Sequence, residues 1–222
     1  MSFISIRAVF RVMVATIATA AAATAPDIHA LAQAVDNKYN HLHTLEAQFT
    51  EIYRGAGVDR TESGILWLKK PGKMRWEYRS PREKLFLSDG KDAWFYVPED
   101  RRVQKTSIRE LDDLRSPIGF LLGKTRLEKE LQGLSFAPDV PPLQPENVVI
   151  RGIPKVLRER VSQVLLEITP GRQIARIVIQ EVDGGVTEYR FSGQKEEVEL
   201  TDARFRFVPP PGTEVTQGAF EP

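Results

Sequence analysis

A run of short apolar segments separated by turn signals constrains the fold of this chain most. Between residues 45 and 106, stretches rich in β-branched and aromatic residues alternate with turns at intervals of about ten residues, a spacing typical of a sandwich or barrel. The connections are too short for helical crossovers, so the strands must be antiparallel. The turn signals are Arg54-Gly55-Ala56-Gly57, Lys70-Pro71-Gly72-Lys73, Ser80-Pro81, Asp89-Gly90 and Pro98-Glu99-Asp100.

The rest of the chain adds helices and a second group of strands, which predicts an α+β domain. Ile28, Leu31, Ala32, Val35 and Tyr39 recur at helical spacing and predict a helix over residues 27–40. Residues 108–122 also have an apolar helical stripe, which Pro117 divides into two short helices. Residues 137–145 should form a loop, and 205–212 a short strand that runs into a rigid loop. Strands are predicted at 45–53, 61–69, 74–78, 85–87, 93–97, 103–106, 148–153, 161–169, 174–182 and 186–192.

The first residues have the pattern of a secretory signal peptide. Arg7 and Arg11 form a basic region, an apolar stretch covers residues 12–20, and small residues follow, with cleavage preferred after Ala23. The apolar stretch is short for a membrane span, which needs about 20 residues. We therefore predict a signal peptide at 1–23 and one exported domain at 24–222, located in the periplasm.

Composition excludes several classes of protein. Removing the predicted signal lowers the number of basic residues from 31 to 29 against 30 acidic ones, so the remaining chain is near neutral and nucleic acid is not an expected partner. Cysteine is absent, which rules out disulfides and a lipid-modified amino-terminal cysteine. A chain of this length can bury a core large enough to be stable without them. We expect a monomer.

Residues for enzymatic or metal chemistry are scarce. Of the three histidines, only His41 and His43 are placed to share a metal ion, and further ligands are missing. The sequence from Gly119 to Thr125 is one residue short of a phosphate-binding loop. Glu196, Glu197 and Glu199 are typical of a solvated surface. No catalytic residue, metal or cofactor is expected; a buried carboxylate pair with shifted pKa values in the interior would reopen that question.

Large apolar side chains are the candidates for function. Each fits an ordinary core, yet a barrel of this size also has an interior that can hold a ligand. Helices carrying apolar residues would then cover it, and acyl chains suit such a cavity because burial contributes about 0.8 kcal/mol per CH₂ group. The candidate lining and lid residues are Trp67, Met74, Trp76, Trp94, Phe120, Leu121 and Leu122.

Four segments resemble those of the LolA family of lipoprotein carriers. The most specific are residues 64–78 (GILWLKKPGKMRWEY) and 87–96 (LSDGKDAWFY), which occur together at the spacing found in that family. Ser116-Pro117 with residues 120–123 is similar to its central helices, and 205–212 (FRFVPPPG) is similar to its carboxyl-terminal segment. The resemblance covers essentially all of the chain after the predicted signal.

This resemblance implies an open, incomplete antiparallel β-barrel with short helices as a lid over an apolar cavity. Family members take lipoproteins from an inner-membrane ABC transporter and deliver them to an outer-membrane receptor. In well-known members, an Arg directly before the Pro of the first segment latches the lid. Lys70 stands at that position and lacks the planar fork of Arg. Met74 stands where the family has a cavity-lining Phe, and Trp76 matches its Trp.

Two other functions remain open within the same fold. One is a periplasmic carrier of other lipids, since an apolar cavity recognises chain length and bulk more than the head group. The other is a lipid sensor, for which a second domain would be expected.

Overall fold

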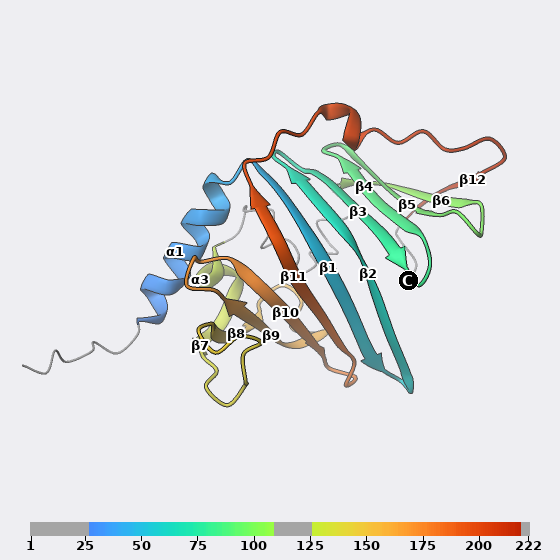
Figure 1. Ribbon diagram of the computed structural model, residues 1–222. Coiled ribbons are helices and arrows are strands. Elements are labelled where there is room, and N and C mark those ends of the chain that lie inside the picture. The colour runs from blue at the N-terminus through green and yellow to red at the C-terminus, as the bar shows by residue number, and fades with distance from the viewer. Residues whose placement is uncertain (1–26, 109–125, 219–222) are drawn as a thin grey trace, which may run out of the picture.

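A single open sheet of 12 strands forms the body of the molecule, in the order β12-β6-β5-β4-β3-β2-β1-β11-β10-β9-β8-β7 (Figure 1). The computed structural model describes residues 27–108 and 126–218. Every described pair of neighbouring strands is antiparallel except β12 and β6, which are parallel. The expected unclosed, mainly antiparallel sheet with few helices is confirmed.

The elements follow the predicted order and add a few short strands and helices to it. Their bounds are α1 Ile28–His41, β1 Thr44–Gly55, β2 Val58–Lys69, β3 Lys73–Ser80, β4 Lys84–Asp89, β5 Asp92–Val97, β6 Arg102–Ser107, α3 Leu127–Glu130, β7 Leu131–Phe136, β8 Val148–Pro154, β9 Val161–Ile168, β10 Ile174–Glu181, β11 Val186–Glu196, the 3₁₀ helix η2 Asp202–Phe205 and β12 Glu214–Gln217.

Helix α1 begins and packs as its sequence predicts. The Asp27 carboxylate accepts a hydrogen bond from the His29 N–H, which caps the helix. The apolar stripe is buried against the sheet, and α1 lies beside α3 in Figure 1. At its far end the Tyr39 hydroxyl accepts a hydrogen bond from the Ile174 N–H at 2.8 Å. That bond ties the helix to β10.

The two halves of the sheet meet at β1. On one side β1 pairs with β2 along its whole length, from Thr44 opposite Lys69 to Gly55 opposite Val58. On the other side it pairs with β11, with Leu45 opposite Glu196. A strand near the amino terminus is therefore held by one near the carboxyl terminus, a pairing that short-range sequence patterns do not contain.

Gly64 allows β2 and β3 to approach each other closely. A Cβ atom at this position would lie 1.8 Å from the carbonyl oxygen of Glu77, next to a register shift between Ser63 and Gly64. Any larger residue would push the two strands apart at this point.

The sheet has two faces with different coverings. We call the face that packs on α1 the inner face, and the opposite one the outer face. The main core lies on the inner face and contains Leu45, Phe49, Leu66, Leu68 and Trp76 together with the α1 stripe. A smaller cluster of Trp67, Leu200 and Phe205 lies on the outer face, under the segment that follows β11. In Figure 1 that segment runs along the upper edge of the sheet through η2 to β12.

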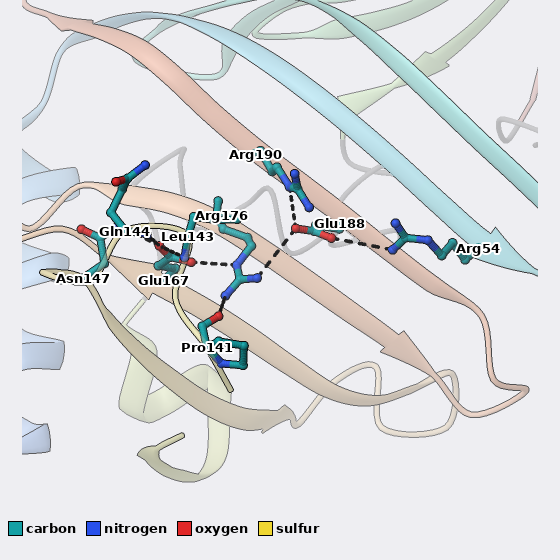
Figure 2. A network of polar contacts seen from close by, with 9 residues as sticks. All are labelled: Arg54, Pro141, Leu143, Gln144, Asn147, Glu167, Arg176, Glu188 and Arg190. Atoms are coloured by element: carbon teal, nitrogen blue, oxygen red, sulfur yellow. Dashed lines mark hydrogen bonds and ion pairs between the residues drawn. The ribbon is translucent and has the colours of Figure 1, made fainter. Parts of the chain in front are cut away.

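A polar network fixes the loop of residues 137–147 to the outer face of β9, β10 and β11 (Figure 2). The buried Glu167 carboxylate accepts hydrogen bonds from the Leu143 N–H and the Asn147 amide, at 2.8 and 2.7 Å. Its other oxygen lies 2.8 Å from Nε of Arg176, which also donates to the Pro141 carbonyl. Arg176 in turn lies 3.8 Å from Glu188, which joins the network to β11. The predicted proline-rich loop is thus an anchored one.

The structure differs from the prediction at four places, one of which is β12 near the carboxyl end. β7 and α3 were not expected, and residues 205–212 do not form a strand, since Phe205 ends η2 and the last strand is β12. Phe205 is buried beside Trp67, while the Phe207 ring lies 5.5 Å from that of Tyr96. Phe205 and Phe207 thus each pack on the outer face of the sheet. Because these two apolar rings are two residues apart, their spacing resembles that of a strand.

Some predictions fall outside the described residues. The signal peptide at 1–23 lies there, as do the helices predicted over 108–122 apart from Ile108. Among the residues that the structure does describe, no helix has the length and apolar character needed to cross a membrane.

Candidate functional site

The candidate site is the inner face of strands β2 to β6. A row of cross-strand partners crosses it in the order Leu66, Trp76, Phe86, Phe95 and Gln104, which we call the Trp76 row. Trp76 is only 2% exposed and lies 4.8 Å from the Phe49 ring, measured between centroids. Its ring also contacts those of Tyr189 and Phe191 on β11. The predicted Trp76 is thus the centre of an aromatic cluster that spans both halves of the sheet.

Met74 and Phe86 lie beside this cluster and are only partly covered. Both pack against the main core on the inner face, and both keep part of their side chain accessible. Met74 lies opposite Leu68 and Ser88, two residues along the strand from Trp76. Met74 and Trp76 are therefore brought together on one face, as a shared lining requires.

Trp67 and Trp94 lie on the outer face, which corrects their expected grouping with Met74 and Trp76. Trp67 packs on Leu200 and Phe205, and its indole N–H donates to Glu46 at 2.9 Å. The Trp94 ring lies 6.3 Å from that of Phe207. Alternation in β2 and β5 turns both tryptophans away from the inner face, because Leu66 and Ala93 occupy the inward positions. They bind the segment after β11 to the sheet.

Lys70 contacts the end of helix α1. Its Nζ donates a hydrogen bond to the Tyr39 carbonyl oxygen, one of the last carbonyls of the helix. Burial lowers the pKa of Lys70, and the nearby Glu197 opposes that shift. Phe120, Leu121 and Leu122, the expected lid, lie outside the described residues. The role of Lys70 as a lid latch stays a prediction.

A buried ionic group at one end of the inner face was missed by the sequence analysis. Glu51 and Glu62 lie directly opposite each other on β1 and β2, and are 8% and 4% exposed. The Tyr78 hydroxyl donates to Glu51 at 2.7 Å, while Lys84 bonds to Glu62. Arg60 Nε lies 3.3 Å from Glu62. Together we call these five residues the ionic cluster.

The alternation of side chains along β1 and β2 indicates that Glu51 and Glu62 point to the inner face. Glu51 follows Leu45, Ala47 and Phe49 at a spacing of two, so it occupies an inward position. Glu62 stands in the same relation to Leu66 and Leu68. Burial raises the pKa of Glu51 above its usual range, and the negative charge of Glu62 acts in the same direction. Burial also raises the pKa of Tyr78.

The histidines are used for local contacts. His29 bonds to Glu128 and so links α1 to α3, and this contact raises the pKa of His29. His41 Nδ1 lies 2.7 Å from the Asn37 carbonyl oxygen, and His43 Nδ1 lies 3.4 Å from Glu197. In the described part of the chain, no three histidine or carboxylate side chains gather in an arrangement that would hold a metal ion.

A comparison with models of known protein families identifies the family of this chain. The family model described as outer membrane lipoprotein carrier protein LolA matches residues 40–208. The chain belongs to the LolA family. That match includes β1 to β11 and every described inner-face residue named above.

Individual proteins are also similar to this chain. An outer-membrane lipoprotein carrier protein of Nitrosospira multiformis is 30% identical over 176 residues, covering 78% of this chain and 81% of that protein. One of Nitrosomonas europaea is 28% identical over 182 residues, covering 79% and 84%. An uncharacterized conserved protein from Thermus thermophilus shares the fold, with a TM-score of 0.54 at 14% identity, covering 85% of this chain and 98% of that one.

Proposed function

We propose that this protein is a periplasmic carrier that holds the acyl chains of lipoproteins against its inner face and delivers them to the outer membrane. Membership of the LolA family, with relatives that are themselves lipoprotein carriers, is the observation that carries this proposal. The partners that we infer are an inner-membrane ABC transporter as donor and an outer-membrane receptor as acceptor. The protein would act as a monomer.

The inner face has the chemistry that acyl chains need. Met74 and Phe86 provide partly accessible apolar surface next to the buried Leu68 and Trp76. Met74 adapts its shape easily because its side chain is unbranched. Each buried CH₂ group of a ligand contributes about 0.8 kcal/mol, so long chains bind without specific polar contacts. Phe120, Leu121 and Leu122 are the candidate lid over this surface.

A carrier accounts for the ionic cluster better than an enzyme does. Glu51 and Glu62 form the buried carboxylate pair that would suggest acid and base catalysis. Both, however, are engaged by Tyr78, Lys84 and Arg60. An ionic group whose carboxylates are already bound by neighbouring side chains suits a structural or orienting role.

The first experiment is native mass spectrometry of the protein isolated from its own periplasm without detergent. We expect a co-purifying lipoprotein that dissociates on activation. Free lipid as the only bound species would instead favour a carrier of other lipids. An empty protein that also takes up no lipoprotein from membranes would contradict the proposal.

Substitutions test whether the inner face binds the lipoprotein. Met74→Glu and Phe86→Glu place a charge on the inner face and should abolish lipoprotein uptake from membranes. Val208→Glu is the matched control, because Val208 is 82% exposed in the segment after η2 and should tolerate the charge. Equal uptake by all three variants would exclude the inner face as the binding surface.

The latch role of Lys70 has its own test. With Lys70→Leu we expect lipoprotein to be taken up but retained. The variant lacks the hydrogen bond from Lys70 that stabilises the closed, empty state, so cargo release loses that driving force. Lys70→Arg keeps a cationic donor and should transfer cargo to the receptor. Transfer by Lys70→Leu at the wild-type rate would remove Lys70 from the mechanism.

A further inference from the structure

Two buried side-chain polar atoms in the described part of the inner face lack a hydrogen-bond partner. Among the described residues, the buried side-chain polar atoms without a hydrogen bond are Nε1 of Trp76, Oε1 of Gln104, Nε of Arg151 and Oε2 of Glu167. Arg151 is paired with Asp139, and Glu167 Oε2 lies 2.8 Å from Arg176. For Trp76 Nε1 and Gln104 Oε1, within the same described residues, no hydrogen-bond partner is present.

Both groups belong to the Trp76 row. The register connects Trp76 to Phe86, Phe86 to Phe95 and Phe95 to Gln104, so a donor and an acceptor lie on the same surface as the partly covered Phe86. Buried polar groups in native proteins are nearly always hydrogen-bonded, and an exception calls for a specific explanation. A ligand with an acceptor group on this face would supply the partner that the Trp76 N–H lacks.

The Trp76 row also marks a boundary in polarity. Two residues from Trp76 in one direction is Met74, opposite Leu68, where the face is apolar. Two residues in the other direction is Tyr78, which bonds to Glu51 of the ionic cluster. Along the strands the inner face therefore changes from hydrocarbon to charge over about 14 Å, since each pair of residues spans about 7 Å.

An acylated ligand has the same order of groups. Its hydrocarbon chains end at carbonyl carbons, and the polar head begins beyond them. When the chains lie over Met74, next to the buried Leu68, the carbonyl oxygens lie level with the Trp76 row, and the head group lies toward Glu51, Glu62 and Lys84.

We propose that the indole N–H of Trp76 donates a hydrogen bond to an acyl carbonyl oxygen of the bound lipid, and so selects chains that are ester- or amide-linked. This inference rests on the proposed function and specifies how the same face orients its cargo. The opposite orientation would place charged groups beside the hydrocarbon chains and leave Trp76 without an acceptor, which is unfavourable on both counts.

The test compares two lipids that differ only in their carbonyl groups. 1,2-Dioctanoylglycerol has ester-linked chains, whereas 1,2-di-O-octylglycerol has ether-linked chains of the same length and no carbonyl. Binding of each to the full-length protein is measured by displacement of a fluorescent apolar dye. We expect the ester lipid to bind about tenfold more tightly, as a hydrogen bond to an otherwise unpaired buried donor implies.

Trp76→Phe should abolish this preference by weakening binding of the ester lipid alone. It removes the N–H and keeps an aromatic ring in place. The matched control is Trp67→Phe, because Trp67 lies on the outer face and should leave the preference intact. Equal affinity for the two lipids in the wild-type protein would overturn the inference. Failure of both lipids to bind would overturn the proposed acyl-binding function as well.

Spectroscopy tests the same contact without relying on the Trp76→Phe variant. The chain has three tryptophans, and their indole N–H signals can be assigned with Trp67→Phe and Trp94→Phe. The ester lipid should move the Trp76 N–H resonance downfield, in the direction of hydrogen bonding, and the ether lipid should not. Identical shifts with both lipids would contradict the inference.

Discussion

Burial of the Glu51 carboxylate disfavours its charged form and raises its pKa. Glu51 faces Glu62 across two strands, and its hydrogen bond from Tyr78 compensates only in part, since burial remains the largest influence on its raised pKa. A carboxyl group whose pKa is higher in the folded than in the unfolded protein binds protons more tightly when folded. Its charged form therefore destabilises the fold as pH rises.

Glu51→Gln should accordingly increase the free energy of unfolding at neutral pH. The gain should shrink as pH falls toward 4.5, the ordinary value for Glu, because the wild-type side chain is then neutral as well. Chemical denaturation of both proteins between pH 4.5 and 8 measures this difference. A difference that does not vary with pH would mean that Glu51 is not under electrostatic stress.

Glu46→Gln should behave in the opposite way. Hydrogen bonds from Lys195 and Trp67 lower the pKa of Glu46, so its charge stabilises the folded protein above the unfolded-state pKa, and that contribution is lost in acid. The two variants thus form a pair with opposite signs in the same pH series.

Removing Glu167 should destabilise the protein by releasing the loop of residues 137–147. Glu167→Ala leaves the Leu143 N–H and the Asn147 amide without an acceptor and Arg176 without its closest counter-charge, a loss of about 3–5 kcal/mol. Arg176→Met leaves the buried Glu167 carboxylate without its counter-charge and should also cost about 3–5 kcal/mol. A loss below about 1 kcal/mol for Glu167→Ala in urea denaturation would contradict the role of Glu167 as the anchor of the 137–147 loop.

Helix α1 illustrates which elements can be predicted from sequence. Asp27 signals the cap, and a buried stripe at helical spacing follows it, so local sequence contained everything needed. Apart from the buried Leu131, β7 and β12 have exposed and half-buried residues, and both form at the ends of the sheet by pairing with a strand already in place. Such edge strands depend on their neighbours more than on their own residues.

Tyr39→Phe tests how α1 is held to the sheet. The substitution removes the acceptor of the buried Ile174 N–H while it keeps the ring, and we expect a loss of about 1–3 kcal/mol in unfolding free energy. Tyr96→Phe is a control on the outer face, where the ring packs on Phe207. Equal stability of the two variants would show that the Tyr39 hydroxyl does not hold the helix.

The segment after β11 is fixed mainly by Phe205. Its side chain is 1% exposed beside Trp67, so Phe205→Ala should cost about 3–5 kcal/mol. Val208→Ala, in the same segment but exposed, should change stability little. Guanidinium denaturation gives both values. A small effect of Phe205→Ala would indicate that the segment is held by its ion pairs, such as those of Asp202 with Lys69 and Lys73.

At the scale of the whole molecule, the face of the sheet to which a side chain points was harder to predict than the position of the strands. Alternation shows that Trp67 and Leu66 point to opposite sides of one strand, but it does not say which side faces α1. That assignment depends on the register of β1 with β11 and on the packing of α1, both of which join distant parts of the chain. Met74 and Trp76 were therefore placed correctly with each other, whereas Trp67 and Trp94 were not.

The pairing of β1 with β11 also sets the order in which the chain can fold. The Lys38 ammonium bonds to a Glu196 carboxylate that is 158 residues away in the sequence. Hairpins such as β1–β2 close locally, but the centre of the sheet must wait until nearly the whole chain is present and a large loop has closed. High contact order of this kind slows folding to milliseconds or seconds. A newly made chain would pass that time with one edge of β1 unpaired, and this edge could pair with other chains and aggregate until β11 is in place.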